Sequence, residues 1–169
     1  HIAQALEIDI LADLPAVFVM QAGDDEGMHQ AADEYLQRLQ PRDGLSQPVL
    51  LENRTKTTWK KGGIPAFTWH WRPGDEVEFY VKGAHDTYTE FDFSEAFIKG
   101  STTWDTTSAA YKAIVGDIDH VSQIFLDLQK EGVAAIFRPL HESGGNWFWW
   151  SINTGKQFIA LYQLLYERM

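Results

Sequence analysis

The residues with the most evident chemistry lie in one segment, which runs from Arg138 to Trp150 and reads RPLHESGGNWFWW. Glu142 follows an apolar run and precedes a glycine pair and four aromatic residues, so we expect its carboxyl group to lie in a concave site walled by rings. Removal of water raises a carboxyl pKa, as a general acid near neutral pH requires. Glu142 is therefore the candidate acid/base, and the alternative is a structural residue that caps a turn or pairs with Arg138.

Three further polar residues could assist Glu142. Arg138 and His141 belong to the same segment, and His70 lies near the end of another apolar run. An arginine can bind substrate or keep a neighbouring carboxylate ionised through paired hydrogen bonds. Either histidine could donate to sugar hydroxyls. A structural ion pair for Arg138 and structural roles for the two histidines remain open alternatives.

Aromatic residues make up 14% of the chain and include seven tryptophans. Successive residues of an extended segment point to opposite sides, so some of the rings from Trp147 to Trp150 are expected in the core and others in a groove. A flat indole can stack on the C–H face of a sugar ring. Trp147, Trp149 and Trp69 are therefore candidate sugar-binding residues, with a purely structural aromatic cluster as the alternative.

Several function classes are disfavoured by composition and motifs. The chain has 14 basic against 24 acidic residues, a net charge of −10, which argues against nucleic-acid binding. It contains no cysteine, no phosphate-binding glycine motif, no Gly-x-Ser-x-Gly and no His-x-x-x-His, so we expect neither a cofactor nor a metal. No apolar run approaches the roughly 20 residues of a membrane span.

The elements that must position these residues alternate between helix and strand. Apolar strands without polar interruption indicate a parallel sheet buried on both faces and wrapped by helices. Three such strands are too few for a closed eight-stranded barrel, so the chain is either a small open sheet or about half of a barrel. We predict helices over Ile2–Ala12, Met28–Leu39, Pro48–Lys61, Tyr111–Lys130 and Thr154–Met169, strands over Ala16–Met20, Ile64–Trp71 and Val133–Leu140, and a long functional loop over Arg72–Ser108.

In the last of these helices, the spacing of apolar residues predicts an inward face. Its members are Phe158, Leu161, Tyr162 and Leu165.

The stretch FRPLHESGGNWFWWS, residues 137–151, resembles the acid/base segment of glycoside hydrolase family 26, a family best known for β-1,4-mannanases. Residues 14–18, 63–70 and 104–108 are similar to further parts of the family pattern in the same order. The resemblance implies an α/β fold, the (β/α)8 TIM barrel, of which this chain would supply roughly strands 2 to 4 and their helices. Residues 1–169 would then form part of one catalytic domain.

The resemblance also implies a retaining double-displacement mechanism with Glu142 as acid/base, supported by His141 and Arg138. It places His70, Trp104 and Trp147 in the lining of the sugar subsites. The family's nucleophile is a second Glu on the seventh strand, which we expect outside this chain, so residues 1–169 alone should be inactive and require the remainder of the barrel. Ser143 and the segment 71–73 depart from the family pattern and affect the expected substrate preference.

The expected function is therefore endo-hydrolysis of β-1,4-mannan, including galactomannan and glucomannan, without a cofactor. A polymeric substrate implies a secreted, cell-surface or periplasmic protein, which we expect to be bacterial. The alternatives are a β-glucanase or β-1,3-xylanase of the same family and a non-catalytic carbohydrate-binding protein. A third alternative is an open-sheet α/β protein whose aromatic residues all belong to the core.

Overall fold

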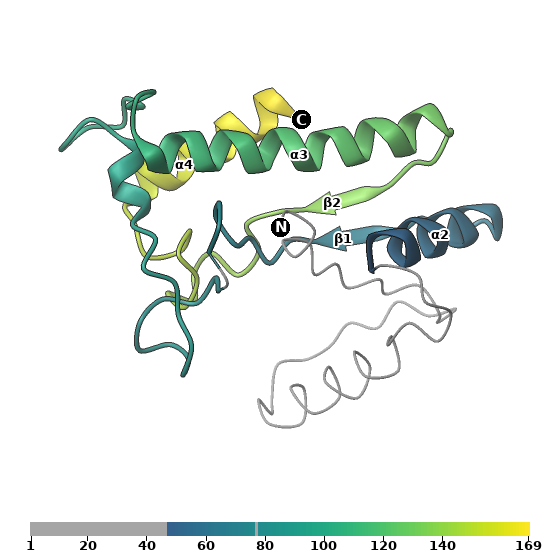
Figure 1. The fold of residues 1–169 in the computed structure, drawn as a ribbon, viewed down its shortest axis with the longest axis horizontal. Helices are drawn as coiled ribbons and strands as arrows, with labels where there is room; N and C mark the ends of the chain where they lie inside the picture. The colour runs from purple at the N-terminus through teal and green to yellow at the C-terminus, as the bar shows by residue number, and fades with distance from the viewer. Residues whose placement is uncertain (1–46, 77) are drawn as a thin grey trace. The chain divides into compact units, whose positions relative to one another are not determined.

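The computed structural model describes residues 47–76 and 78–169, which form parts of two compact units that meet in sequence at Pro65 and Ala66 (Figure 1). The helices predicted over Ile2–Ala12 and Met28–Leu39 and the strand predicted over Ala16–Met20 lie outside the described residues. None of the described helices is long and apolar enough to cross a membrane.

The described part of the first unit, residues 47–65, contains helix α2 (Gln47–Lys60), close to the predicted bounds. The helix ends where Gly62 adopts a left-handed φ of +85°, and its N–H donates to the carbonyl of Trp59. Glycine adopts this conformation without the steric cost that a side chain brings. The glycine pair therefore ends this helix, as the sequence predicts.

The second unit, from Ala66 onward, is built on two parallel strands, β1 (Ala66–Thr68) and β2 (Ile136–Arg138). Phe67 lies opposite Phe137 in the register, and Thr68 lies opposite Arg138. The two strands therefore end side by side, so the residues that follow them, including His70 and His141, leave the same edge of the sheet.

The strand predicted over Val133–Leu140 was expected to be buried on both faces, and this expectation is wrong for β2. Phe125 of the overlying helix covers one face through edge and tilted contacts with Phe67 and Phe137, with ring centroids 5.3 and 4.8 Å apart. Ile136, by contrast, is 55% exposed. An apolar run shows that a strand can be buried, whereas the neighbours that bury it come from elsewhere in the fold.

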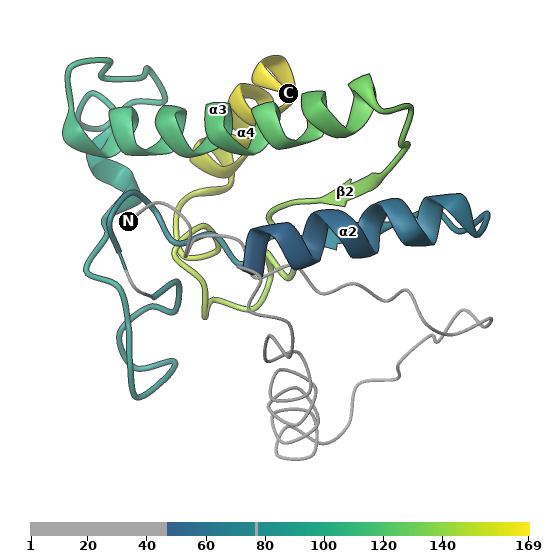
Figure 2. The same cartoon turned by 45° about the vertical axis from the view of Figure 1, so that its right-hand side comes forward.

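Helices α3 (Ala109–Lys130) and α4 (Gly155–Arg168) pack against each other, and both views of the fold show α3 running along β2 (Figures 1 and 2). Ser108 caps α3 by accepting from the N–H of Tyr111, and Thr154 caps α4 in the same way. An ion pair between Arg168 and Asp119 joins the two helices.

The inward face of α4 is narrower than predicted. Leu161 and Leu165 are buried, whereas Tyr162 is 50% exposed. Adjacent helix positions are separated by about 100°, so a buried stripe through Leu161 and Leu165 leaves the next residue at its edge. The prediction for Tyr162 was therefore wrong.

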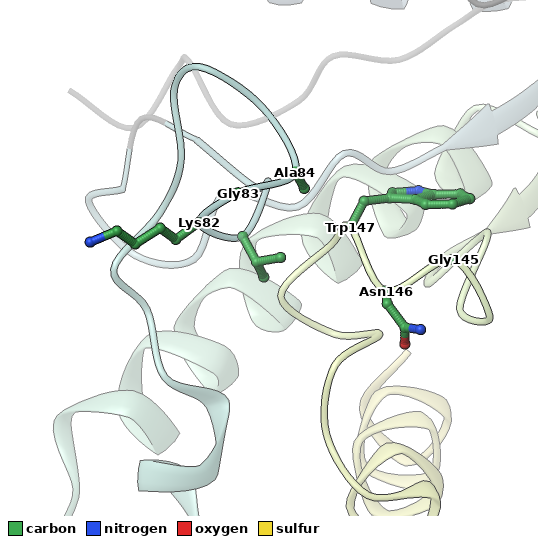
Figure 3. A pocket seen from close by; sticks show the side chains of 7 residues that line it. Lys82, Gly83, Ala84, Gly145, Asn146 and Trp147 are labelled. Atoms are coloured by element: carbon green, nitrogen blue, oxygen red, sulfur yellow. The ribbon is translucent and has the colours of Figure 1, made fainter.

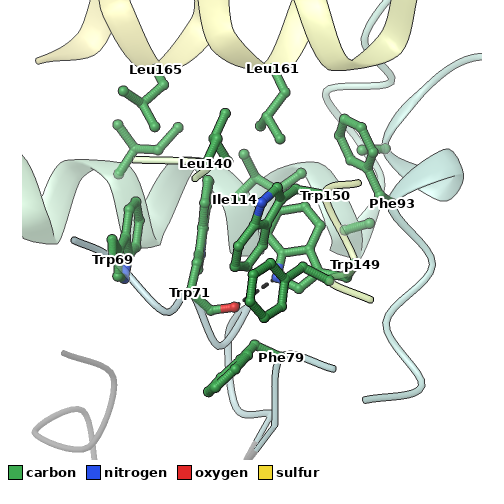
Figure 4. Close-up of a cluster of buried hydrophobic side chains, with 14 of the residues drawn as sticks. Trp69, Trp71, Phe79, Phe93, Ile114, Leu140, Trp149, Trp150, Leu161 and Leu165 are labelled. Atoms are coloured by element: carbon green, nitrogen blue, oxygen red, sulfur yellow. Dashed lines mark hydrogen bonds between the residues drawn. The ribbon is translucent and has the colours of Figure 1, made fainter. Parts of the chain in front are cut away.

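The core of this unit is dominated by aromatic rings that come from four separate segments (Figure 4). The predicted long loop contributes to it through a short 3-10 helix, η2 (Phe93–Ala96), in which Phe93 and Ala96 are buried. Figure 4 also shows Leu161 and Leu165 of α4 extending from their helix toward the aromatic cluster. The fully buried large side chains of the core include Trp71, Phe93, Ile114, Ile118, Trp149 and Trp150.

Candidate active site

Glu142 lies in a tight turn that begins where β2 ends. Leu140 and Glu142 have left-handed φ angles of +51° and +54°, which residues other than glycine rarely adopt. The N–H of Gly145 donates to the carbonyl of Glu142 and closes the turn at 3.0 Å. The Glu142 side chain is exposed, and its Oε2 accepts a hydrogen bond from Nε1 of Trp147 at 3.2 Å. Strained backbone of this kind occurs at sites where the surrounding structure holds a side chain in place.

The environment of Glu142 differs from the sequence expectation. We expected a carboxyl group enclosed by several rings, and the described residues leave it open with the Trp147 indole beside it. The cause is that Phe148, Trp149 and Trp150 all turn into the core. These residues form a turn, closed by the Ser151 N–H to the Phe148 carbonyl at 2.9 Å, so their side chains do not alternate as in an extended segment.

The structure brings His70 and His141 together, one after each strand. Their ring centroids are 4.7 Å apart in an edge-to-face arrangement. His141 is buried, with 7% of its surface exposed, and burial chiefly lowers its pKa to about 4, with further lowering by the charges of His70 and Arg138. His141 is therefore neutral at pH 7. Within residues 47–76 and 78–169, no group forms a hydrogen bond with its buried Nδ1.

Arg138 occupies the last position of β2, opposite Thr68, and its side chain is exposed. Arg138 therefore lies at the strand end, as predicted. It is close enough to His141 for its positive charge to lower the pKa of that histidine. In the described structure its effect on the site is therefore electrostatic.

Trp69 and Trp149 differ from the prediction that they stack on a sugar ring. Trp69 lies parallel to Trp71 with ring centroids 4.1 Å apart, and it is 2% exposed. Trp149 is fully buried, and its Nε1 donates to the backbone carbonyl of Trp71 at 2.7 Å (Figure 4). Neither ring has a face accessible to a ligand, so both are packing residues of the core next to the strand ends.

Trp104 lies in a different pocket from Trp147. It is half-buried and stacks on Phe97 with centroids 4.2 Å apart. The pocket, of about 400 Å³, is otherwise lined largely by α4, including Lys156 and Ile159. The structure thus does not place Trp104 and Trp147 in a common pocket.

Two residues that hold the site were not identified from the sequence. Trp150 donates from Nε1 to the carbonyl of His141 at 3.0 Å, which fixes the backbone next to Glu142. Asp117 accepts from Nε1 of Trp71 at 2.7 Å and from the N–H of Gly74 at 2.9 Å, and burial raises its pKa. In the sequence, Asp117 stands out as an acidic residue within the apolar stripe of α3, and this feature could have identified it.

An open groove of about 380 Å³ adjoins Trp147 (Figure 3). One wall is the loop segment Val81–Ala84, and the other is Gly145–Trp147, which follows Glu142. We call this feature the loop groove. It places a partly exposed indole between the carboxylate of Glu142 and a concave surface.

Metal binding finds no support in the part of the chain that the structure describes, where no three His, Asp or Glu side chains gather in a way that could hold an ion.

Comparison with known proteins shows similarity to β-mannanases. Residues 43–169 match the profile of Glycosyl hydrolase family 26. The chain is 41% identical over 118 residues to mannan endo-1,4-beta-mannosidase A of Piromyces sp, covering 66% of this chain and 17% of that protein. It is 28% identical over 117 residues to the mannan endo-1,4-beta-mannosidase of Bacillus subtilis strain 168, covering 66% of this chain and 29% of that protein. The chain thus spans less than a third of the length of these curated relatives.

Two solved structures share the fold. One is the β-mannanase from a symbiotic protist of the termite Reticulitermes speratus, complexed with gluco-manno-oligosaccharide. The two structures align with a TM-score of 0.61 at 28% sequence identity, and the alignment covers 87% of this chain and 49% of that chain. The other is the Podospora anserina GH26-CBM35 β-(1,4)-mannanase, with a TM-score of 0.57 at 28% identity, covering 75% of this chain and 28% of that chain. The predicted family and barrel fold are confirmed: the chain belongs to glycosyl hydrolase family 26 and has the fold of part of a (β/α)8 barrel.

Proposed function

We propose that this chain carries the acid/base half of a retaining endo-β-1,4-mannanase. The observation that carries the proposal is the exposed Glu142 carboxylate at the end of β2, hydrogen-bonded by Trp147 and followed by a groove. The mannan endo-1,4-beta-mannosidases among its relatives support β-mannan as the substrate class. The oligosaccharide bound to the termite-symbiont enzyme supports glucomannan as well.

In the proposed reaction, Glu142 first acts as the acid. Its carboxyl proton passes to the glycosidic oxygen while a second carboxylate attacks the anomeric carbon, so the C–O bond to the leaving chain breaks as a glycosyl-enzyme ester forms. Glu142, now ionised, then takes a proton from water, whose oxygen attacks the same carbon and releases the nucleophile. The exposure of Glu142 leaves its carboxyl group accessible to both the substrate and the water.

The second carboxylate must lie about 5–5.5 Å from Glu142 in a retaining enzyme. We propose that it comes from outside residues 1–169, on a later strand of the barrel. Residues 1–169 alone would then bind oligosaccharide without cleaving it.

Neutral His141 has a role that follows from its surroundings. Its Nδ1 is buried and forms no hydrogen bond within the described residues, although an uncharged imidazole offers one donor and one acceptor. We assign this nitrogen to a sugar hydroxyl or to a polar group of the remaining barrel. His70, whose ring meets His141 edge to face, would fix the orientation of that ring.

The proposal is tested in a completed barrel, by which we mean residues 1–169 joined to the remaining strands and helices of a family 26 enzyme. Glu142→Ala should lower kcat on mannan by roughly 10²–10⁴-fold. The same variant should keep far more of its first-step rate on an aryl mannoside with a strongly acidic phenol as leaving group, because that group departs without protonation. Glu90→Ala, at an exposed glutamate of the long loop, is the matched control.

Equal loss on both substrates would remove Glu142 from the role of acid. If the completed barrel with wild-type Glu142 binds mannan without cleaving it, and Glu142→Ala leaves that binding unchanged, the chain instead belongs to the alternative class of non-catalytic carbohydrate-binding proteins.

The remaining alternatives concern substrate and location. Rates on β-glucan and β-1,3-xylan, compared with β-mannan, separate the proposed activity from the other specificities expected for the family. We also propose that the protein acts outside the cytoplasm, because its substrate is a polymer, and that its source is a bacterium. Mannanase activity that stays in the cytosolic fraction of the source cells would contradict the proposed location.

A further inference from the structure

Both peptide units that flank Glu142 are held by hydrogen bonds. The carbonyl of Glu142 accepts from the N–H of Gly145 at 3.0 Å, within the same turn. The carbonyl of His141, which belongs to the peptide unit before Glu142, accepts from Nε1 of Trp150 at 3.0 Å. This second bond is buried and joins the turn to the core. The backbone at Glu142 therefore depends on an indole that the proposed mechanism does not otherwise use.

The indole bond bears directly on the left-handed φ of +54° at Glu142. Rotation of the peptide unit between His141 and Glu142 changes ψ of the first residue and φ of the second together. A negative φ is sterically favoured for a residue that carries a side chain. Without a donor to the His141 carbonyl, the turn can relax by flipping this peptide unit, which redirects the Glu142 side chain. The Trp150 N–H opposes the flip because it fixes the direction of the carbonyl.

The Trp150 ring has little freedom to follow such a movement. It is fully buried and stacks on Phe148, with ring centroids 4.4 Å apart and an interplanar angle of 29°. It also meets Trp149 edge to face, with centroids 5.6 Å apart. The backbone N–H of Phe148 donates to Oγ of the buried Ser151 at 3.1 Å. Packing on fixed neighbours thus holds the donor to His141, as the support of a catalytic group requires.

Trp149 provides a direct comparison within the same turn. It is also fully buried, and its Nε1 donates to the carbonyl of Trp71 at 2.7 Å (Figure 4). This bond joins the turn to the segment after β1 and involves neither peptide unit next to Glu142. The two neighbouring indoles therefore make the same type of buried bond, and of the two, Trp150 is the one that fixes the acid/base residue.

We propose that Trp150 is a positioning residue for the acid step. Its indole N–H holds the peptide unit between His141 and Glu142 in the orientation that directs the Glu142 carboxyl group toward the glycosidic oxygen. This inference rests on the proposed function. Because Trp150 is fully buried and does not touch the substrate, loss of its N–H should impair proton transfer and leave sugar binding nearly intact.

The test removes the donor in the completed barrel and keeps a ring. Trp150→Phe should lower kcat on mannan roughly 10–100-fold, with KM within about twofold of wild type, because the acid is misplaced while the sugar contacts remain. The first-step rate on an aryl mannoside with a strongly acidic phenol, read from the burst of released phenol, should fall less than about threefold, because that group departs without protonation. If the Phe variant fails to fold, replacement of Trp150 by 3-benzothienylalanine, which has sulfur in place of the ring N–H, serves instead.

Trp149→Phe is the matched control, since it removes the neighbouring indole donor. Any loss that it causes should affect both substrates equally, so the ratio of kcat on mannan to the first-step rate should stay within about twofold of wild type. Equal losses on both substrates in the folded Trp150 variants, or no loss on either, would overturn the positioning role.

A double substitution separates failure of this inference from failure of the proposed function. In a Glu142→Ala background, Trp150→Phe should lower kcat on mannan by less than about twofold further, because no carboxyl group remains to be positioned. An undiminished effect in that background would overturn the inference and leave the role of Glu142 intact. If Glu142→Ala alone lowers the rates on both substrates equally, the proposed function fails, and this inference fails with it.

Discussion

Nε1 of Trp147 lies 3.2 Å from Oε2 of Glu142 and donates a hydrogen bond to it, while 40% of the Trp147 surface remains exposed. One side chain thus combines two contributions that usually come from different residues. Its polar edge orients the carboxylate, and its apolar face remains available for stacking. The two contributions can be separated by substitution.

Trp147→Phe should lower kcat of the completed barrel about tenfold, because it removes the donor to Glu142 but keeps a ring, and a hydrogen bond to a charged group contributes about 1.5–3 kcal/mol at most. Trp147→Ala should add an increase in KM, because the stacking face is lost as well. Steady-state kinetics on mannopentaose measures both. Identical KM values for the two variants would show that the ring does not bind sugar.

Gly145 lies close to the same indole. A Cβ at position 145 would overlap the six-membered ring of Trp147, whereas a Cβ at Gly144 would meet no atom within 4 Å. Neither glycine has a left-handed φ, so alanine at either position is compatible with the backbone. We expect Gly145→Ala to displace the indole and lower kcat/KM about tenfold, and Gly144→Ala to change it less than twofold.

A double-mutant cycle shows whether the effect of Gly145→Ala passes through Trp147. In a Trp147→Ala background the overlapping ring is absent, so Gly145→Ala should have little further effect on kcat/KM. Full additivity of the two substitutions would mean that Gly145 affects the site by another route.

The juxtaposition of the two histidines was predictable because it depends on fold class. Continuous apolar runs predicted β1 and β2 and their parallel pairing, and parallel strands deliver the residues that follow them to one edge. His70 and His141 therefore meet, as the sequence implies. The helix bounds were also close to the predicted ones, because Ser108, Thr154 and the glycine pair at 62–63 are strong local end signals.

The orientation of the tryptophans was less predictable. Alternation is a property of extended backbone, and residues 148–151 form a turn, so the sequence alone did not reveal that Trp149 and Trp150 both point inward. The same applies to the left-handed φ of Leu140 and Glu142, which depends on the surrounding core rather than on local preference. The exposure of Glu142 follows from this turn, and it could not be read from the run of aromatic residues after it.

Asp117 provides a test of how the core holds the strand end. Asp117→Leu should destabilise the protein by roughly 1–3 kcal/mol, because it leaves the Trp71 indole N–H and the Gly74 N–H without their acceptor. Asp117→Asn keeps an acceptor oxygen and removes a carboxylate whose pKa is raised by burial, so its cost should be much smaller. Chemical denaturation of both variants at pH 7 measures the difference. Equal destabilisation by Leu and Asn would show that the charge itself matters.

His141 predicts a pH dependence of stability. Its pKa falls from 6.5 to about 4 on folding, so between these values the unfolded chain binds a proton that the folded chain does not. Stability from this residue is therefore fully present above pH 6.5 and is lost as the pH falls toward 4, by up to about 3 kcal/mol.

Carboxylates titrate in the same range, so the informative quantity is the difference in unfolding free energy between wild type and His141→Gln. That difference should change between pH 7 and pH 4.5 in favour of the variant. The matched control is the same difference for His120→Gln, at an exposed histidine of α3. A difference for His141→Gln that is no more pH-dependent than the control would mean that burial does not keep His141 neutral in the folded protein.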